Sequence, residues 1–397
     1  MTGRVLIIAG NLGRFGETDG VVTTYWSLLP LLAEAGLEAD VVGYGPESRV
    51  DRMGSLRIFT HKPVVPAKID PHRWIDLFPV FSSTAKELRK TKYVAVQSSS
   101  PCPLGLFGLA RARANNAPLI GLYHTALDHY VEIRSTTKWG KPIGKLFGGL
   151  MHFWLNVYYN RASLILTPSV HTRDEVRERL KPRVDVLSRG VDGDRFHPRH
   201  RTRPLDARPV EALYVGRIAY EKNLQQLGAM LSGMPDLRAV IVGDGPYYEA
   251  MQKEYPNYRY LGRLKGEELS TAYANGDFFV FPSHTDTLGN VVLEAMSSGL
   301  PAIVYDSMGP KELVDQGKTG FIAKSDEEFA QAVRLLATDH DLRNRMRIAA
   351  RAAAELRTWK AIADQLIGYY EQVTGRSLTE SVSRIKTKQH FIPQEIS

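Results

Sequence analysis

Two series of short apolar segments, each opening with a run that leads into a glycine-containing loop, constrain the fold of this chain most strongly. The first series opens with Arg4–Gly10 and the second with Val210–Gly216. Continuous apolar runs rich in β-branched residues are typical of strands buried on both faces of a parallel sheet. The pattern predicts an α/β chain with two Rossmann-like doubly wound domains. Further strands are expected at residues 41–44, 94–96, 119–123 and 164–167, and then at 238–246, 258–262, 278–282 and 302–305.

The boundary between the two domains is expected near residue 200. Residues 196–209 are rich in proline and arginine and show no hydrophobic period, which is typical of a linker. We therefore expect one domain at 1–200 and another at 201–373, with a helix at about 374–397 that packs back on the first. Two such domains facing each other would leave a cleft at the carboxyl ends of their strands, where open α/β sheets bind ligands.

Composition excludes several classes of protein. Hydrophobic residues make up 43% of the 397 and charged residues 24%, which excludes a disordered chain and a small disulfide-stapled scaffold. The single cysteine, Cys102, excludes an internal disulfide and a cysteine-based zinc site. The apolar run at 5–9 is shorter than the roughly 7–15 residues of a signal-peptide core, and no run reaches the roughly 18 residues of a membrane span. We expect a cytoplasmic protein, soluble or peripherally bound to the inner face of the cytoplasmic membrane.

Positive charge is concentrated in the first half of the chain. Residues 1–200 contain 27 Lys and Arg against 18 Asp and Glu, whereas residues 201–397 contain 24 against 25. The first half should therefore meet an anionic partner. Residues 133–161 hold basic and aromatic side chains and no acidic one, which suits either an ordinary packed helix with a basic end or a segment that docks on anionic lipid. The candidate membrane or acceptor residues are Arg134, Lys138, Trp139, Lys141 and Lys145.

A first candidate ligand site follows the strand that opens the second series. Arg217 comes directly after Gly216, and Lys222 lies five residues further on. Two cations between a strand and the start of a helix form an anion site that a diphosphate would fit. The alternative is charge that only solubilises the surface.

A second candidate site lies in residues 282–301. A strand ends at Pro282, and the loop that follows carries Asp286 before a helix that presents Glu294. The backbone N–H groups of residues 289–291 would face an anion at the helix start. Carboxylates beside a phosphate site suit the hydroxyls of sugar and ribose, because one carboxylate accepts two such hydrogen bonds. The alternatives are a helix N-cap for Asp286 and a favourable interaction with the helix dipole for Glu294.

Four motifs occur together in the second half: Gly216-Arg217-x4-Lys222, Val242-Gly-Asp-Gly-Pro246, Tyr260-Leu-Gly-Arg-Leu264 and Asp286-x7-Glu294. In this order they resemble the donor half of the retaining GT-B glycosyltransferases of family 4. In the first half, Asp19-Gly-Val21, Tyr123-His-Thr125 and Arg189-Gly-Val-Asp192 also fit that family. The resemblance implies two Rossmann-like domains, of which 1–200 lies on the acceptor side and 201–373 binds the donor.

The resemblance also implies a role for each matching residue. Arg217 and Lys222 would hold the donor diphosphate. Glu294 would bind the ribose hydroxyls, and Asp286 would bind the transferred sugar. His124 would face that sugar, although the residue taken alone also suits a histidine buried in the core. The family usually has glutamate where this chain has Asp286, so the sugar would meet a shorter carboxylate. The donor-binding loops would comprise Gly16, Gly20, Gly216, Gly262, Arg263, Leu264, Leu288, Gly289, Asn290 and Val291.

Three other sequence patterns are weaker evidence of function. Asp192-Gly-Asp194 and Asp339-His-Asp341 match the Asp-x-Asp metal signature of a different glycosyltransferase fold, but neither follows a strand in a suitable way, and the second reads as a helix cap. We expect no required metal or cofactor, because Arg217 and Lys222 can neutralise a diphosphate. Gly243-Asp-Gly245 imitates half of a dinucleotide fingerprint and lacks the last glycine.

The expected activity is retaining transfer of a hexose from a nucleotide-diphosphate sugar to an acceptor hydroxyl. We expect UDP rather than GDP in the donor. The acceptor is expected to be a membrane lipid, because Tyr123-His-Thr125 followed by the basic aromatic segment resembles sulfoquinovosyl- and mannosyl- or glucosyl-diacylglycerol synthases. The alternatives are a polysaccharide precursor as acceptor, a nucleotide-sugar epimerase or hydrolase, and a non-catalytic sensor. A nucleic-acid partner is not expected, because no nucleic-acid-binding motif is present.

Overall fold

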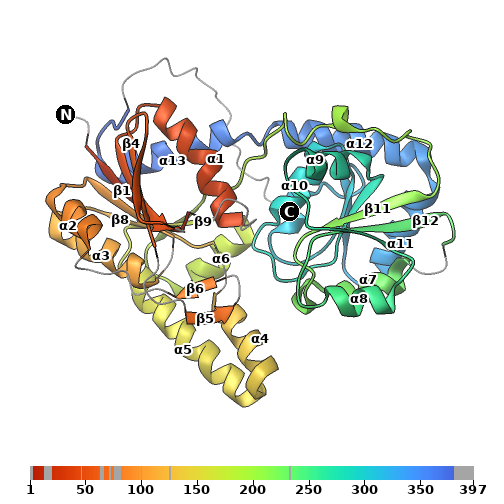
Figure 1. The fold of residues 1–397 in the computed structure, drawn as a ribbon, viewed down its shortest axis with the longest axis horizontal. Helices are drawn as coiled ribbons and strands as arrows, with labels where there is room; N and C mark the ends of the chain where they lie inside the picture. Colours follow the sequence, from red (N-terminus) through yellow and green to blue (C-terminus); the bar gives the residue numbers. More distant parts are fainter. Residues whose placement is uncertain are drawn as a thin grey trace. The chain divides into compact units, whose positions relative to one another are not determined.

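The computed structural model describes residues 3–12, 20–45, 47–62, 67–70, 73–75, 82–99, 101–124, 127–231 and 234–379. The chain divides into two compact units (Figure 1). Unit 1 combines residues 1–188 with 360–397, and unit 2 is formed by residues 189–359.

Unit 1 is built on an eight-stranded sheet in the order β10-β9-β8-β7-β1-β2-β4-β3. Its neighbouring strands pair in parallel, except that β3 runs antiparallel to β4 at the edge. The apolar run that opens the chain is β1, and residues 5–9 of it are fully buried, as expected of a central strand. The strands are β1 (Val5–Asn11), β2 (Ala39–Tyr44), β3 (Arg49–Met53), β4 (Leu56–His61), β7 (Ala95–Ser98), β8 (Leu119–Leu122), β9 (Leu164–Thr167) and β10 (Arg183–Val186), with β5 (Ala67–Asp70) and β6 (Arg73–Ile75) in a separate antiparallel pair.

The helices of unit 1 include one from the far end of the chain. Tyr370 of α13 donates a buried hydrogen bond of 2.5 Å to Gln97 of β7, which fixes this helix to the sheet of unit 1. α13 ends at Thr374, and Gly375 follows with a φ of 65°, the left-handed conformation that commonly terminates a helix. The helices are α1 (Gly20–Glu34), α2 (Ser83–Lys90), α3 (Pro103–Asn115), α4 (Leu127–Trp139), α5 (Lys141–Tyr159), α6 (Val170–Arg179) and α13 (Trp359–Thr374).

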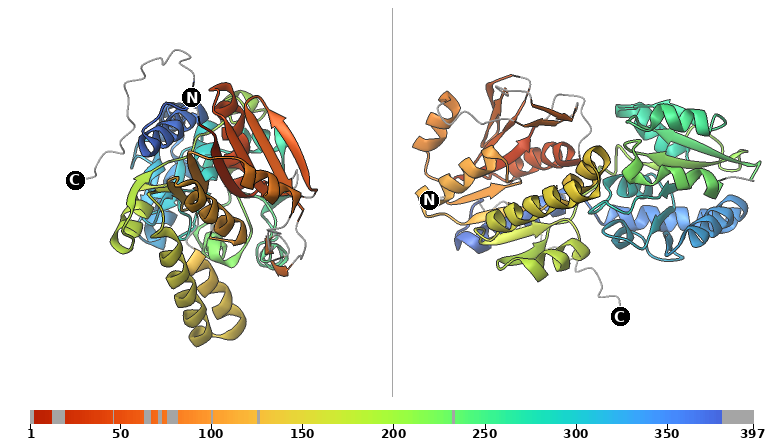
Figure 2. Two further views of the ribbon diagram at one scale, coloured as in Figure 1. Left: turned by 90° about the vertical axis from the view of Figure 1, so that its left-hand side faces the viewer. Right: turned by 90° about the horizontal axis from the view of Figure 1, so that it is seen from below.

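Unit 2 contains a six-stranded, all-parallel sheet in the order β13-β12-β11-β14-β15-β16. Its strands are β11 (Val210–Val215), β12 (Leu237–Val242), β13 (Arg259–Gly262), β14 (Phe278–Phe281), β15 (Ala302–Tyr305) and β16 (Gly320–Ala323). The helices are α7 (Leu224–Leu231), α8 (Tyr248–Glu254), α9 (Gly266–Asn275), α10 (Asn290–Ser297), α11 (Asp326–Thr338) and α12 (His340–Glu355), with 3-10 turns η1 (Pro198–His200), η2 (Tyr220–Lys222) and η3 (Pro310–Leu313). Figure 2 shows this sheet with helices on both faces.

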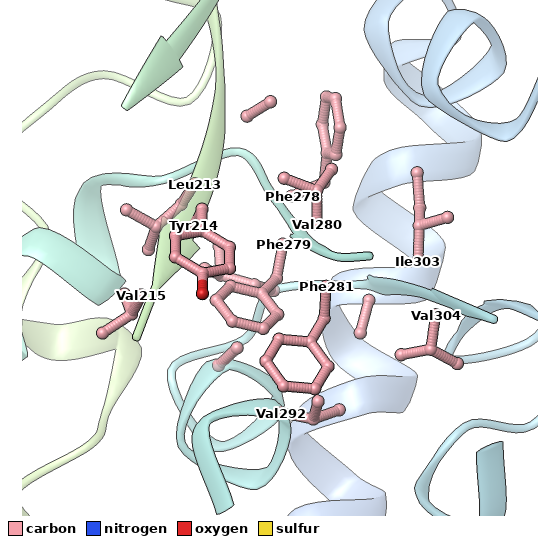
Figure 3. Packing of buried hydrophobic residues seen from close by; sticks show 14 of the residues in the cluster. Leu213, Tyr214, Val215, Phe278, Phe279, Val280, Phe281, Val292, Ile303 and Val304 are labelled. Atoms are coloured by element: carbon pink, nitrogen blue, oxygen red, sulfur yellow. The ribbon is translucent and has the colours of Figure 1, made fainter. Parts of the chain in front are cut away.

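Aromatic packing holds the centre of unit 2 together. All four residues of β14 are buried, and the ring of Phe281 stacks on those of Phe279 and Tyr214, with centroids 6.1 and 6.4 Å apart (Figure 3). Strand β14 is an interior strand, paired with β11 on one side and β15 on the other, and helices cover both faces of the sheet, so both faces of the strand must be apolar. This core fixes where β11 and β14 end, and the candidate site lies at those ends.

The structure divides the chain at different residues from those expected. The segment 196–209 is not a linker but part of unit 2: Phe196 is buried against the Tyr273 ring, and Arg201 and Arg203 both form ion pairs with the buried Asp277. The chain passes between units at 188/189 and 359/360, so most of the helix assigned to the second domain belongs to unit 1. A helix at 374–397 is not seen where the chain is described, to residue 379; residues 380–397 lie outside the described part.

The expected fold class is confirmed, because both units are Rossmann-like parallel sheets with the predicted strands near their predicted positions. Within the described residues, no helix combines the length and the apolar character that crossing a membrane requires.

Candidate active site

The candidate site in unit 2 lies where its strand order reverses. From β11 the chain moves to β12 on one side of the sheet, and β14 leads to β15 on the other side. The loops after β11 and β14 therefore diverge at the carboxyl edge of the sheet, which is where open α/β sheets bind ligands. Arg217 and Lys222 lie in the first of these loops and Asp286 in the second.

Backbone contacts fasten the strand-end loops to one another. Gly216 N–H donates to the Val242 carbonyl at 3.0 Å, and Gly243 N–H donates to the Gly262 carbonyl at 2.8 Å. A Cβ on Gly243 would lie 1.9 Å from the Gly216 oxygen, and one on Gly245 would lie 2.3 Å from the Ile218 oxygen. The glycines of Gly243-Asp-Gly245 are thus explained by close approach of two backbones, without any dinucleotide.

Lys222 and Asp286 join the two diverging loops. The Lys222 Nζ lies 2.8 Å from Asp286 Oδ1 and 2.6 Å from Oδ2, and both side chains are only partly exposed. Lys222 closes the 3-10 turn η2, and Asn223 after it adopts a left-handed conformation with a φ of 56°. The structure thus brings together a predicted cation and a predicted carboxylate, but as partners of each other.

Arg217 lies one residue after Gly216, with a partly exposed guanidinium. Its Nη1 is 3.6 Å from Glu221 Oε1, a separation at which the ion pair contributes little at a surface. The Tyr214 hydroxyl donates to the Arg217 carbonyl at 3.0 Å, so the backbone at this position is held from the strand below.

The helix after the second loop begins at Asn290, and Gly289 is its N-cap, with a φ of 82°. Asp286 is therefore not the N-cap, so the alternative interpretation of this residue is wrong. Leu288 is buried and anchors the loop, while Asn290 and Val291 occupy the first turn, whose backbone N–H groups have no partner within the helix. This turn has the donors that a phosphate oxygen requires.

Glu294 lies one turn further along α10 and has an unusual environment. Burial raises its pKa to about 7, although the Tyr273 hydroxyl donates a hydrogen bond of 2.7 Å to Oε2 that acts in the opposite direction. Tyr273 comes from α9 and is fully buried. With this pKa, both the charged and the neutral form of the Glu294 carboxyl are populated near neutral pH. Tyr273 was not predictable as a site residue, because nothing in the local sequence pattern connects a helix residue to an acid 21 positions later.

The remaining residues predicted for the donor site lie at the end of β13. Gly262 has a φ of 62° and its carbonyl accepts from Gly243, which ties this strand end to the neighbouring loop. Arg263 is exposed just after the strand, and Leu264 packs on the core of unit 2. They lie at the same edge of the sheet as Gly216, as expected.

In unit 1, His124 follows β8 and is half-buried. The Tyr123 hydroxyl accepts a hydrogen bond of 2.6 Å from Arg179 Nη2, and Arg179 Nη1 donates one of 2.8 Å to Asp128. Desolvation raises the pKa of Asp128, but hydrogen bonds from Arg179 and His152 outweigh it and leave that pKa lowered. This network, which no local sequence pattern predicts, holds the strand end that carries His124. Gly20 is exposed and begins α1, while Gly16 and Thr125 lie outside the described residues.

The Asp-x-Asp patterns have structural explanations. Asp192 Oδ1 accepts from the backbone of Asp194 and Arg195 in a tight turn, and Asp339 caps α12 by accepting from Leu342 at 2.8 Å. In the part of the chain that the structure describes, no three His, Cys, Asp or Glu side chains gather as metal ligands would.

The basic aromatic segment forms two helices, α4 and α5, which break at Gly140. Arg134 is half-buried on α4, whereas the other four candidate membrane residues are exposed around the break: Lys138, Trp139, Lys141 and Lys145.

Two family models match the chain: Glycosyltransferase Family 4 over residues 18–195 and Glycosyl transferases group 1 over residues 199–353. A GDP-mannose-dependent alpha-mannosyltransferase of Mycobacterium tuberculosis (strain CDC 1551 / Oshkosh) is 31% identical over 391 residues, which cover 95% of this chain and 99% of the relative. The sulfoquinovosyl transferase SQD2 of Arabidopsis thaliana is 33% identical over 70% of this chain and 57% of its own length. Among solved structures, sucrose-phosphate synthase from Thermosynechococcus elongatus matches with a TM-score of 0.74 at 18% identity, covering 94% of this chain and 99% of that one. The chain therefore belongs to the family 4 glycosyltransferases, and its two Rossmann-like domains are those of the GT-B fold.

Proposed function

We propose that this glycosyltransferase moves a mannosyl residue from GDP-mannose to a lipid hydroxyl with retention of configuration. Two relatives that align over nearly the whole chain are named GDP-mannose-dependent alpha-mannosyltransferases. We favour GDP over the UDP expected from the sequence, because no residue in the sequence identifies the nucleotide base of the donor. The observation that carries the proposal is the Lys222–Asp286 pair at the strand-order reversal, with Glu294 close by in the helix that follows Asp286.

The donor diphosphate would bind to Arg217, Lys222 and the first turn of α10. As the sugar leaves, negative charge develops on the phosphate oxygen, and donors already in position stabilise that charge without reorganising. The Lys222 ammonium has three N–H donors, so it can hold Asp286 and a phosphate oxygen at once. The ion pair thus keeps the ammonium at the strand ends before donor arrives.

The carboxylates would orient the two sugars of the donor. Asp286 would accept from hydroxyls of the transferred mannose, and Glu294 would accept from the ribose diol, because each carboxylate offers two acceptor oxygens. The Tyr273 hydrogen bond leaves Glu294 Oε1 available for this purpose.

Retention follows if an α-linked donor gives an α-mannoside. We propose that the acceptor hydroxyl attacks C1 on the face from which the diphosphate departs. The bond from C1 to the phosphate oxygen breaks, the new C1–O bond forms, and the hydroxyl proton passes to the departing phosphate. No protein nucleophile takes part in this scheme, in contrast to retaining glycosidases with two carboxylates.

A lipid acceptor is proposed on two grounds. Relatives include the sulfoquinovosyl transferase SQD2 and an alpha-monoglucosyldiacylglycerol synthase of Streptococcus pneumoniae, 22% identical over 64% of this chain. The exposed basic and aromatic residues of α4 and α5 suit peripheral attachment to an anionic membrane.

A donor-by-acceptor screen tests the proposal. Purified protein is incubated with GDP-mannose, UDP-glucose or UDP-galactose and membrane lipid extract, and the lipids are analysed by mass spectrometry and proton NMR. We expect an α-mannolipid from GDP-mannose. A product formed only from a UDP-sugar would refute the donor, a β-linked product would refute retention, and free sugar or an epimer formed without lipid would favour a hydrolase or epimerase.

A further inference from the structure

Tyr273 lies in the core of unit 2 and directs its hydroxyl at the candidate site. The residue belongs to α9 and is fully buried, and its hydroxyl donates the hydrogen bond of 2.7 Å to Glu294 Oε2 on α10. Burial keeps the pKa of Tyr273 well above its ordinary value of 10, so the hydroxyl is a permanent donor near neutral pH. One hydrogen bond thus joins α9 to the carboxyl group on α10.

Two other aromatic rings fix the direction of this hydroxyl. The edge of Phe196 meets the Tyr273 ring at a centroid distance of 5.3 Å and an angle of 87°. Phe279 of β14 contacts the same ring at 6.1 Å and 39°. Because the two rings come from different segments of the chain, the phenol cannot tilt without displacing one of them.

The Phe196 brace is fastened to the same helix that carries Glu294. The Phe196 carbonyl accepts hydrogen bonds of 2.7 Å from Ser297 Oγ and 3.0 Å from Arg351 Nη1 of α12. Ser297 is the last residue of α10, three positions after Glu294. The contacts therefore form a closed circuit, in which Tyr273, its brace and the carboxylate that it binds are held at fixed separations.

The two oxygens of the Glu294 carboxyl differ in their surroundings. Within the described part of the chain Oε1 accepts no hydrogen bond, yet it is not a buried atom, so it faces solvent. One further charged side chain among the described residues acts on this carboxyl: the Arg195 guanidinium, 5.0 Å from the centre of the Phe196 ring, also favours the charged form. Glu294 thus offers a ligand one acceptor oxygen, whose direction the bond to the other oxygen sets.

We propose that Tyr273 is a positioning residue of the transfer reaction, which holds Glu294 Oε2 so that Oε1 is presented to the ribose diol of the donor. The inference rests on the proposed function, which assigns the ribose to Glu294. Tyr273 is itself too buried to reach a ligand and acts through the carboxylate. Without this hydrogen bond the glutamate side chain would rotate more freely, and donor binding would have to order it.

Tyr273→Phe tests the proposal, because phenylalanine keeps the ring between Phe196 and Phe279 and removes only the hydroxyl. Calorimetry measures the Kd for GDP at a series of pH values. Carbon NMR follows the Glu294 carboxyl without nucleotide, and Glu294→Gln identifies its signal. Loss of the hydroxyl should raise the Glu294 pKa, because the hydrogen bond favours the charged form. We expect GDP to bind about tenfold more weakly near pH 7, and the difference to narrow in alkaline solution.

The kinetic constants separate positioning from chemistry. The KM for GDP-mannose should rise about as much as the Kd for GDP, while kcat changes less than about threefold, because Tyr273 reaches neither the diphosphate nor the reacting carbon. In Glu294→Gln, addition of Tyr273→Phe should leave the pH profile of GDP binding as it was, since an amide does not titrate. The thermal transition shows that each variant is folded.

A matched control is Tyr258→Phe, in the same unit. The Tyr258 hydroxyl donates to the Gly228 carbonyl at 3.4 Å, and the residue lies just before β13, at the edge of the sheet opposite the candidate site. This variant also loses a tyrosine hydroxyl and should bind GDP like the wild type at every pH. A loss of GDP affinity that is equal at every pH in Tyr273→Phe and Tyr258→Phe would overturn the proposal, because it would show general loosening of unit 2.

The NMR measurement needs no donor, so the positioning role and the proposed function can fail separately. A Glu294 pKa that does not rise in Tyr273→Phe would overturn the positioning role, even where GDP-mannose is the donor. If the pKa rises and UDP binds in place of GDP, with the same sensitivity to Tyr273→Phe, the positioning role is supported, because UDP carries the same ribose diol. That result would refute only the donor given under the proposed function.

Discussion

Replacing Glu294 by glutamine should make the protein more stable and a poorer enzyme. In the folded chain, burial raises the Glu294 pKa to about 7, against an ordinary value of 4.5. The folded state therefore holds the proton more tightly than the unfolded state, and this group's contribution to stability falls as pH rises from 4.5 to about 7. The difference in pKa corresponds to about 3 kcal/mol at pH values above this window. Glutamine is neutral and keeps an oxygen that can accept from Tyr273.

The predicted pH dependence distinguishes this effect from an ordinary packing change. Glu294→Gln should unfold with nearly the same free energy as the wild type at low pH, and its advantage should grow to about 3 kcal/mol in alkaline solution. Denaturant unfolding at a series of pH values measures the difference, and carbon NMR of the Glu294 carboxyl measures the pKa directly. Since two compact units can unfold separately, the transition of unit 2 is the one to follow.

The same variant should bind donor worse, because an amide offers one acceptor oxygen where the carboxylate offers two and carries no charge. A loss of about 1–3 kcal/mol, or roughly tenfold to a hundredfold in the Kd for GDP-mannose, is expected above pH 7. As a control, ribose-free mannose phosphate should bind both proteins alike. A stability difference independent of pH would refute the assigned pKa, and an unchanged donor Kd would remove Glu294 from the site.

Three further results are expected. Arg217→Ala should lower kcat/KM about a hundredfold or more, because the guanidinium would stabilise the leaving diphosphate. Thermal stability should change little, because this side chain is partly exposed. An unchanged kcat/KM would exclude the role in catalysis. Gly243→Ala should destabilise unit 2 by about 3 kcal/mol or more in denaturant unfolding, since its Cβ would overlap the Gly216 oxygen; normal stability would show that these loops separate easily. Activity should survive EDTA, if cationic side chains alone neutralise the diphosphate; loss of activity restored by a divalent cation would contradict this.

The central strands were predictable from the sequence because a strand that is buried on both faces consists of consecutive apolar residues. Phe278–Phe281 is apolar throughout, and it is β14. Edge strands lack that signature: β3, Arg49–Met53, is polar and exposed, and its strand character depends on pairing with β4. The segment 196–209 was misjudged for a related reason. Its prolines and arginines suggest a linker until Asp277, far along the chain, is known to bind Arg201 and Arg203.

In the candidate site, too, the features with a local sequence signal were predictable and those that depend on distant partners were not. Local motifs predicted which residues gather at the strand ends, because parallel strands deliver their following loops to one edge of the sheet. The partners of those residues were not predictable from spacing. Neither the Lys222–Asp286 contact, which spans 64 residues, nor the Tyr273–Glu294 hydrogen bond has a local signal.

These pairings bear on how the site would select its ligand. Without donor, the charge on Lys222 is balanced by Asp286, so a weakly charged anion gains little by approaching. A diphosphate brings enough charge to hold the ammonium while Asp286 also keeps it, and it reaches Arg217 and the α10 turn as well. The sugar hydroxyls then give Asp286 new donors to replace any contact it loses. On this argument GDP alone should bind more weakly than GDP-mannose, and the difference should shrink in Asp286→Asn, where the balancing charge is removed and the amide offers one acceptor oxygen to the sugar where the carboxylate offered two.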